Sequence, residues 1–156
     1  MKKDFLTTDK LRLEVEKLWI QHIKLCQDNF LYFVQEMWQD FICRKEKDPS
    51  RWGHHQIIAR EFTNIAHEKK GRLIINMPPR HTKSEFASIY FPAWMIGKNP
   101  KLKIMQVSHN TELAVRFGSK VRNLIDSPEY KQIFGNVKLR EDSKAKGRWE
   151  TNFGGE

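Results

Sequence analysis

The stretch Gly71-Arg-Leu-Ile-Ile-Asn-Met-Pro-Pro-Arg-His-Thr-Lys-Ser-Glu85 determines the architecture that we expect for this 156-residue chain. It opens with an apolar run at residues 73–75, which is too short for a core helix and is bounded by Gly71 and a double proline. Such a run is typical of a strand buried on both faces, as in a parallel sheet. A proline-stiffened turn follows, and Lys83-Ser84 then open a segment with helical spacing.

A strand, a tight loop, Lys-Ser and a helix are the layout of a phosphate-binding P-loop. A helix N-terminus offers backbone N–H groups and a partial positive charge, so a loop joined to it can hold a polyphosphate. Against the pattern G-x-x-x-x-G-K-[ST], the two glycine positions hold Met77 and Thr82, which makes the pattern alone a weak match. The alternative interpretation is an ordinary strand-to-helix turn with a solvated lysine at position 83.

The segment Asn76-Met-Pro-Pro-Arg-His-Thr-Lys-Ser-Glu85 resembles the P-loop of phage terminase large subunits, in which proline and arginine replace the first glycine. Thr82 departs from that family, which usually has glycine there, and threonine tolerates fewer backbone conformations. Further tracts that resemble this family lie along most of the chain: Trp52-Gly-His-His-Gln56, Phe91-Pro-Ala-Trp94, Gly97-Lys-Asn-Pro100, Ser108-His-Asn-Thr-Glu-Leu-Ala114 and Phe117-Gly-Ser-Lys-Val-Arg122.

The resemblance implies an α/β P-loop NTPase fold of the helicase-like (ASCE) type, with a parallel sheet and a helical N-terminal extension. We assign residues 1–50 to the extension and residues 51–156 to the N-terminal part of the ATPase domain. ATP hydrolysis in this class needs an acidic pair at the end of a buried strand. Glu141-Asp142 follows a poor strand, and no nuclease-type acidic cluster is visible. We therefore expect an incomplete domain that ends before the acidic Walker B strand.

The function implied by the resemblance is ATP-driven packaging of viral DNA into a procapsid, carried out by an ATPase with ATP and Mg²⁺ as cofactors. Its expected partners are double-stranded DNA, the portal protein and the small terminase subunit, with a homo-oligomeric ring on the portal. The expected location is the cytoplasm of an infected or lysogenic bacterial host. Consistent with that location, the sequence has no run as long as a membrane span and no signal-peptide core.

The resemblance also implies roles for individual residues. Lys83 would hold β/γ-phosphate oxygens, Ser84 would ligate Mg²⁺, and Arg80 would stabilise charge developing on the γ-phosphate. Gln56 would read the adenine edge with its amide group. The alternatives are that Arg80 pairs with a nearby carboxylate and that Gln56 merely starts a helix. The expected nucleotide-binding set is Pro79, Arg80, His81, Thr82, Lys83, Ser84 and Gln56.

A second strand is predicted at residues 104–107, followed by a helix at residues 111–125. Ser108 follows that strand, and Ser108, Arg116 and Arg122 are the candidate nucleic-acid contacts. The net charge supports this hypothesis, because residues 1–50 carry 9 Lys/Arg and 9 Asp/Glu, so the whole excess of +9 lies in residues 51–156. A basic excess suits a protein that handles polyanions, although a solvated basic surface is the alternative.

The first half of the chain predicts helices at residues 5–25, 28–41 and 55–68. The first is amphipathic, and the aromatic face of the second is expected to pack in the core, with a docking surface for a partner as the alternative. A zinc site using Cys43 with His54 or His55 lacks paired ligand spacing. The apolar stripe of the predicted helix at residues 5–25 consists of Leu11, Val15, Leu18, Trp19 and Ile23.

Two other functions remain open from the sequence. One is a helicase-type ATPase that depends on nucleic acid, which would differ in motifs outside this stretch of chain. The other is a non-catalytic DNA-binding module with a degenerate P-loop, which would bind DNA in a salt-sensitive manner without responding to ATP.

Overall fold

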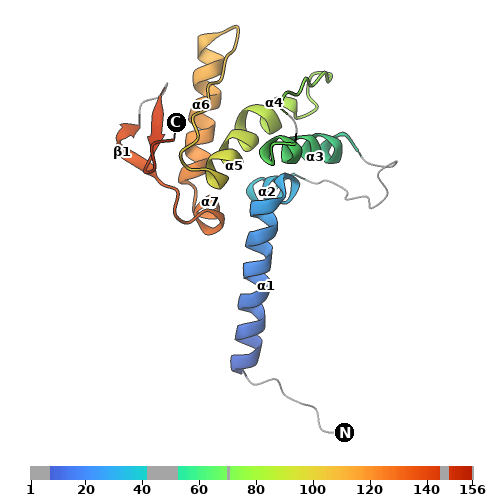
Figure 1. Cartoon of the computed structure of the whole chain (residues 1–156), viewed down its shortest axis with the longest axis vertical. Helices are drawn as coiled ribbons and strands as arrows, with labels where there is room; N and C mark the ends of the chain where they lie inside the picture. The colour runs from blue at the N-terminus through green and yellow to red at the C-terminus, as the bar shows by residue number, and fades with distance from the viewer. Residues whose placement is uncertain (1–7, 42–52, 70, 145–147, 156) are drawn as a thin grey trace.

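The computed structural model describes residues 8–41, 53–69, 71–144 and 148–155 (Figure 1). The described chain is mainly helical and has one small antiparallel sheet. Among the described residues, no helix combines the length and the apolar character that crossing a membrane requires. The elements in order are α1 (Thr8–Asp28), α2 (Phe30–Met37), α3 (His54–Ala66), α4 (Lys83–Glu85), η2 (Phe86–Tyr90), α5 (Phe91–Lys98), α6 (Thr111–Asp126), α7 (Pro128–Ile133), β1 (Leu139–Lys144) and β2 (Trp149–Thr151).

The predicted parallel sheet is wrong, and with it the expected P-loop NTPase fold. In the described part of the chain the only sheet is the antiparallel pair β1–β2, with Leu139 opposite Thr151. The runs at residues 72–77 and 102–107 are extended but belong to no sheet. In each run only one side is packed against the rest of the chain and the other side faces solvent, so Ile74, Met105 and Val107 are 86%, 87% and 85% exposed. An extended run that has no neighbouring strand can bury only the side that packs on helices, because its side chains alternate between two faces.

The core is aromatic and centres on α2, as its sequence predicted. Phe30 is 0% exposed and meets three other phenylalanine rings edge-on at centroid distances of 5.3 to 5.7 Å. Edge-to-face pairs of this kind add to the free energy gained from burial alone. The three rings are Phe62 of α3, Phe86 of η2 and Phe91 of α5, so α2 ties three helical segments together.

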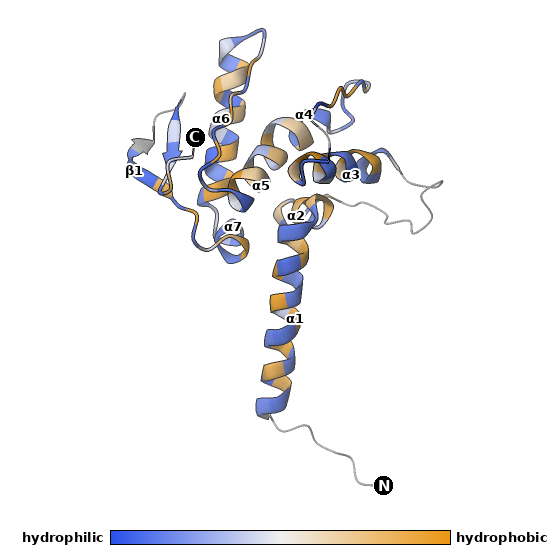
Figure 2. Ribbon diagram, viewed as in Figure 1, coloured by the Kyte–Doolittle hydropathy of each residue, from blue (hydrophilic) through white to orange (hydrophobic). Residues whose placement is uncertain are grey.

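Helix α1 projects from the body of the molecule, and apolar residues recur along its exposed length (Figure 1 and Figure 2). The predicted amphipathic helix is present, but its apolar stripe is largely uncovered, since Val15 and Leu18 are 63% and 65% exposed. Only the C-terminal turns of α1 reach the core, where Cys26 is fully buried. The physical reason is that no described element covers the N-terminal turns of the helix.

Pro92 predicts a kink or a helix end near Tyr90 in the helical segment that begins at Lys83. In the structure that segment is α-helical only to Glu85 and continues as the π-helix η2 to Tyr90, and a second α-helix, α5, begins at Phe91 with the proline in its first turn. Pro92 has no N–H to donate to the carbonyl of Ser88, four residues earlier. The Gln106 side chain donates to that carbonyl over 2.7 Å. The Gln106 side chain therefore supplies the Ser88 carbonyl with a donor that Pro92 cannot provide.

The C-terminal part is held by caps and by the β1–β2 hairpin. Helix α6 matches the predicted helix closely, and the Asn110 side chain caps it by accepting from the Glu112 N–H. The hairpin was not predicted, because its strands are rich in charged residues. It is fastened to the helices by Trp149, whose indole donates to the Gly118 carbonyl, and by Thr151, whose hydroxyl donates to the Pro100 carbonyl.

Candidate functional site

The turn at residues 77–82 connects the first extended run to α4 through two strained positions. Arg80 and Thr82 have φ angles of 64° and 60°, in the left-handed region that glycine adopts at little cost. A β-branched residue such as Thr82 is a pronounced outlier there. Thr82 occupies the position at which the terminase pattern has glycine, and the backbone of this chain keeps the glycine-like conformation despite the substitution. Thr82 therefore holds a backbone conformation that glycine would reach at lower cost.

A histidine holds the strained threonine in place. His55 Nε2 lies 2.8 Å from Thr82 Oγ1, and the Thr82 hydroxyl donates to the His81 carbonyl over 2.7 Å. Because the hydroxyl proton is used in that bond, His55 Nε2–H is the donor to Thr82. Burial, followed by the neighbouring His54 and His81, lowers the pKa of His55 from 6.5 to about 4. His55 is consequently neutral at neutral pH, with its one ring proton on Nε2, where it makes this hydrogen bond.

Lys83 and Ser84 open α4 and line a hollow of about 400 Å³. The Lys83 ammonium turns back onto the loop and donates to the Met77 carbonyl over 3.4 Å, a long and weak hydrogen bond. Among the residues that line the hollow, two are basic and none is acidic. The hollow is therefore electrostatically suited to an anion. Its lining consists of Phe62, Ile65, Gly71, Arg72, Leu73, Ile75, Lys83, Ser84, Ala87 and Ser88.

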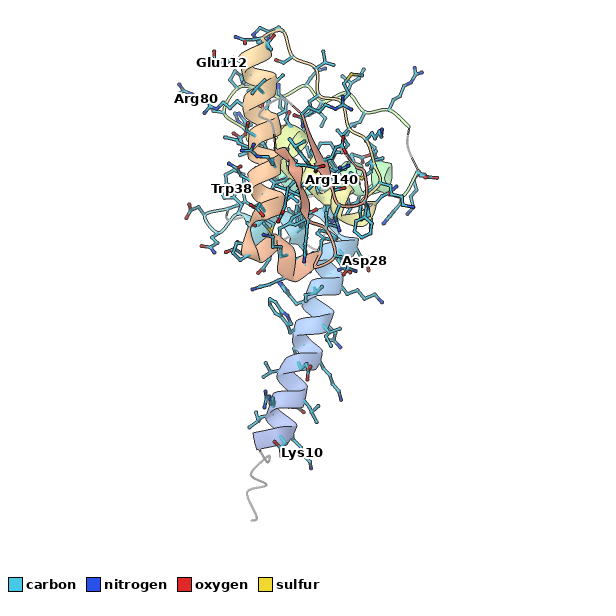
Figure 3. All side chains as sticks on the ribbon, turned by 90° about the vertical axis from the view of Figure 1, so that its left-hand side faces the viewer. Lys10, Asp28, Trp38, Arg80, Glu112 and Arg140 are labelled. Atoms are coloured by element: carbon cyan, nitrogen blue, oxygen red, sulfur yellow. The ribbon has the colours of Figure 1, made fainter. Side chains whose placement is uncertain are left out.

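The other predicted nucleotide contacts do not line this hollow. Arg80 is exposed, and Figure 3 shows its side chain pointing away from the body of the molecule. Pro79 and His81 are also exposed, and His81 Nδ1 donates to the Pro79 carbonyl over 2.8 Å. Gln56 is buried in the first turn of α3 and faces a different hollow, between α2 and α3. The structure thus brings Lys83 and Ser84 together but separates both from Arg80 and Gln56.

His55 is the residue that sequence reasoning missed. The sequence drew attention to Gln56, whereas the neighbouring His55 contacts the loop. The sequence places the pair His54-His55 beside the predicted start of this helix but does not indicate which loop residue either ring would meet. In the structure both histidines reach the loop, since the His54 ring centroid lies 5.8 Å from that of His81. Cys43 and Trp52, to which the sequence interpretation also referred, lie outside the described residues.

The predicted nucleic-acid residues come from two separate segments of the chain. Ser108 follows the second extended run, and Arg116 is exposed on α6. Arg122 donates to the Asn123 side chain over 3.2 Å. At 3.6 residues per turn, Arg116 and Arg122 point about 120° apart around the helix axis. A straight duplex that lies along one face of α6 would therefore not face both arginines directly.

The acidic pair Glu141-Asp142 lies on the exposed strand β1. The hydrogen bond from Arg140 holds the pKa of Asp142 below its usual range, and its oxygen lies 2.6 Å from the guanidinium. A carboxylate engaged in an exposed ion pair is poorly placed to ligate a metal in a buried site.

A larger hollow of about 460 Å³ lies between α5, α6 and β2. Its lining is mainly apolar, with Arg148 as the single charged residue among the residues that form it. Thr111 opens α6 there and Arg148 supplies one positive charge, whereas the hollow beside Lys83 has two basic residues and a hydroxyl residue, Ser84, next to one of them. The chemistry therefore favours the smaller hollow for a highly charged anion.

Comparison with known proteins adds no assignment. No protein-family model matches the chain, and neither a curated protein nor a solved structure shows significant similarity to it.

Proposed function

We propose that the loop at residues 77–84 binds the phosphates of ATP, and that the chain serves in ATP-driven DNA packaging of the phage terminase type. The observation that carries the proposal is the position of Lys83 and Ser84. Both open a helical run that continues to Lys98, and both line a hollow whose charged residues are all basic. The resemblance of residues 76–85 to the terminase loop supplies the choice of ATP among possible anions.

The chemistry of phosphate binding does not require a parallel sheet. The first turn of a helix presents backbone N–H groups without intrahelical partners and the positive end of the helix dipole. The Lys83 ammonium can leave the long hydrogen bond to the Met77 carbonyl and move to a phosphate oxygen at small cost. The Ser84 hydroxyl would then complete the shell of a Mg²⁺ ion that bridges two phosphates.

Turnover by this chain alone is expected to be low. A kinase or ATPase site needs carboxylates that hold the metal and position the attacking water. The residues that line the hollow beside Lys83 include no carboxylate. In a complete motor we propose that this chain works with double-stranded DNA, a portal protein and a small terminase subunit, in a ring of identical copies in the host cytoplasm.

The test is nucleotide binding by the purified chain in the presence of Mg²⁺, measured by calorimetry. Replacing Lys83 by Ala removes a charged hydrogen bond that is worth roughly 1.5–3 kcal/mol, so affinity should fall about 10- to 100-fold. Lys120→Ala is the matched control, because Lys120 is an exposed lysine on α6, away from the hollow. Equal affinities for the wild type and Lys83→Ala would refute the proposed phosphate role.

A DNA-binding module without nucleotide chemistry is the second candidate, and the excess of +9 in residues 51–156 favours it. This function predicts DNA affinity that falls steeply with salt, together with a melting temperature that ATP and Mg²⁺ leave unchanged. A helicase-type ATPase would instead show both nucleotide binding and DNA-stimulated hydrolysis once its acidic residues are supplied.

A further inference from the structure

Three side chains capable of binding a metal converge where α1 meets α2. His22 Nε2 lies 2.8 Å from Glu36 Oε2, and Cys26 Sγ lies 3.7 Å from His22 Nε2. The potential ligand atoms of these three residues all lie within 4.8 Å of one another. No other such group of three occurs among the residues that the structure describes.

Local structure explains this convergence. His22 and Cys26 are four residues apart on α1 and therefore share one face of the helix. The chain turns at Asn29, which caps α2 by accepting from the N–H groups of Leu31 and Tyr32. Helix α2 then packs against the end of α1, so that Glu36 meets His22. The Cys26 backbone is further fixed by the Trp94 indole, which donates to its carbonyl over 2.9 Å.

We propose that His22 Nε2, Cys26 Sγ and a Glu36 carboxylate oxygen bind a Zn²⁺ ion, with water in the fourth position. A thiolate, an imidazole and a carboxylate are all ligands that zinc uses in proteins. Cys26 is 0% exposed, whereas the side chains of His22 and Glu36 are 38% and 34% exposed. The site therefore has a buried sulfur at its base and an open side toward solvent, through which the ion and its water can enter.

Tetrahedral coordination fits the separation between His22 and Cys26 and requires a movement of Glu36. Zinc bonds of about 2.0–2.1 Å to nitrogen and about 2.3 Å to sulfur place these two atoms about 3.6 Å apart. The observed separation between His22 Nε2 and Cys26 Sγ is 3.7 Å. A nitrogen and an oxygen on the same ion would lie about 3.3 Å apart. Glu36 must therefore withdraw by about half an ångström, which its rotatable side chain allows.

The helix dipoles also favour a cation at this place. Cys26 lies in the last turn of α1, which ends at Asp28, and Glu36 lies in the last turn of α2, which ends at Met37. Both helix C-termini carry partial negative charge that stabilises a nearby cation. This site is separate from the hollow beside Lys83 and does not depend on the ATP-binding proposal.

Co²⁺ is the probe that tests the site, because a cysteine thiolate bound to Co²⁺ gives a near-ultraviolet charge-transfer band. We expect the reduced, tag-free 156-residue chain to show this band at one equivalent of Co²⁺, and Zn²⁺ to abolish it. Cys26→Ser should lose the band, whereas Cys43→Ser, the matched control at the other cysteine, should keep it. Glu36→Gln should weaken Co²⁺ binding by roughly tenfold or more.

A wild-type chain without the band, or a band that survives in Cys26→Ser, would overturn the proposal. Because Cys26 is fully buried, circular dichroism must show that Cys26→Ser is folded. If that variant does not fold, Glu36→Gln decides the question, since Glu36 is partly exposed and its amide has the same shape as the carboxylate. Unchanged Co²⁺ affinity in Glu36→Gln would then reject the three-residue site.

Discussion

Gln106 Nε2 donates a 2.7 Å hydrogen bond to the main-chain carbonyl of Ser88, which Pro92 cannot serve as a backbone donor. This bond links the second extended run to η2. The other atom of the same amide, Gln106 Oε1, is buried and has no hydrogen-bond partner among the described residues. The Gln106 amide thus satisfies the Ser88 carbonyl through its nitrogen while its own oxygen stays unsatisfied.

We expect Gln106→Ala to lower the free energy of unfolding by about 1 kcal/mol, the usual net value of such a bond. In a Pro92→Ala background the new N–H of residue 92 can donate to the Ser88 carbonyl, so the same substitution should cost less. A double-mutant cycle of urea denaturation curves measures the difference. Strictly additive effects would show that the proline and the glutamine are not coupled.

Thr82 should report on strain in the turn before α4. Thr82→Val keeps a β-branched residue at a φ of 60° and removes the hydroxyl that meets His55. Thr82→Gly also loses that hydroxyl but relieves about 1–2 kcal/mol of strain at a left-handed position. We therefore expect the glycine variant to be more stable than the valine variant by about 1–2 kcal/mol. Equal unfolding midpoints for the two would argue against strain.

The stability of the chain should fall as the pH is lowered from about 6.5 to about 4. Burial and two neighbouring histidines lower the pKa of His55 from 6.5 to about 4 in the folded state. Above pH 6.5 the residue is neutral in both states and the contribution of His55 is fully present. Below that pH the unfolded chain binds the proton first, so the free energy of unfolding decreases until the folded state is protonated too.

The comparison of His55→Gln with His67→Gln isolates the contribution of His55 to the pH dependence of stability. His67 lies at the exposed end of α3, so its replacement should leave the pH dependence as it is. Urea midpoints across this pH range should decline less steeply in His55→Gln than in the wild type. A His55 imidazole that titrates near pH 6.5 in the nuclear magnetic resonance spectrum of the folded chain would contradict the expectation.

Truncation of Phe30 and of Leu18 should change stability by very different amounts, although both residues are large and apolar. Phe30 is fully buried among the rings of three helical segments, so Phe30→Ala should cost about 3–5 kcal/mol and can unfold the chain. Leu18 lies on the projecting part of α1, so Leu18→Ala should change stability by no more than about 0.5 kcal/mol. Thermal unfolding followed by circular dichroism separates the two results.

Local sequence signals predicted the helices better than the architecture. The period of apolar residues placed α2 and α6, because this signal acts within a few residues. The structure adds the side-chain caps at Asn29 and Asn110. The parallel sheet depended on strands finding each other across the chain, and apolar runs alone do not supply a neighbour. For the same reason, the period of α1 predicted an amphipathic helix but not whether anything covers its apolar side.

The candidate site was predicted in part. Lys83 and Ser84 were placed at the start of a helix by the sequence, and they line one hollow. The separation of Gln56 from that hollow depends on how α3 is rotated about its axis, which the spacing of apolar residues leaves uncertain by a fraction of a turn. The contact between His55 and Thr82 depends on the same rotation and on a strained backbone, and neither has a local sequence signal.

The two extended runs also bear on how the chain behaves at high concentration. Residues 72–77 and 102–107 lie outside any sheet and expose Ile74, Met105 and Val107, so they offer templates for strand pairing between molecules. Arg72 and Lys101 flank these templates and are exposed, and like charges on neighbouring copies oppose such pairing. Salt screens that repulsion. Raising the ionic strength should therefore favour precipitation of this strongly basic chain through pairing of these two runs between molecules.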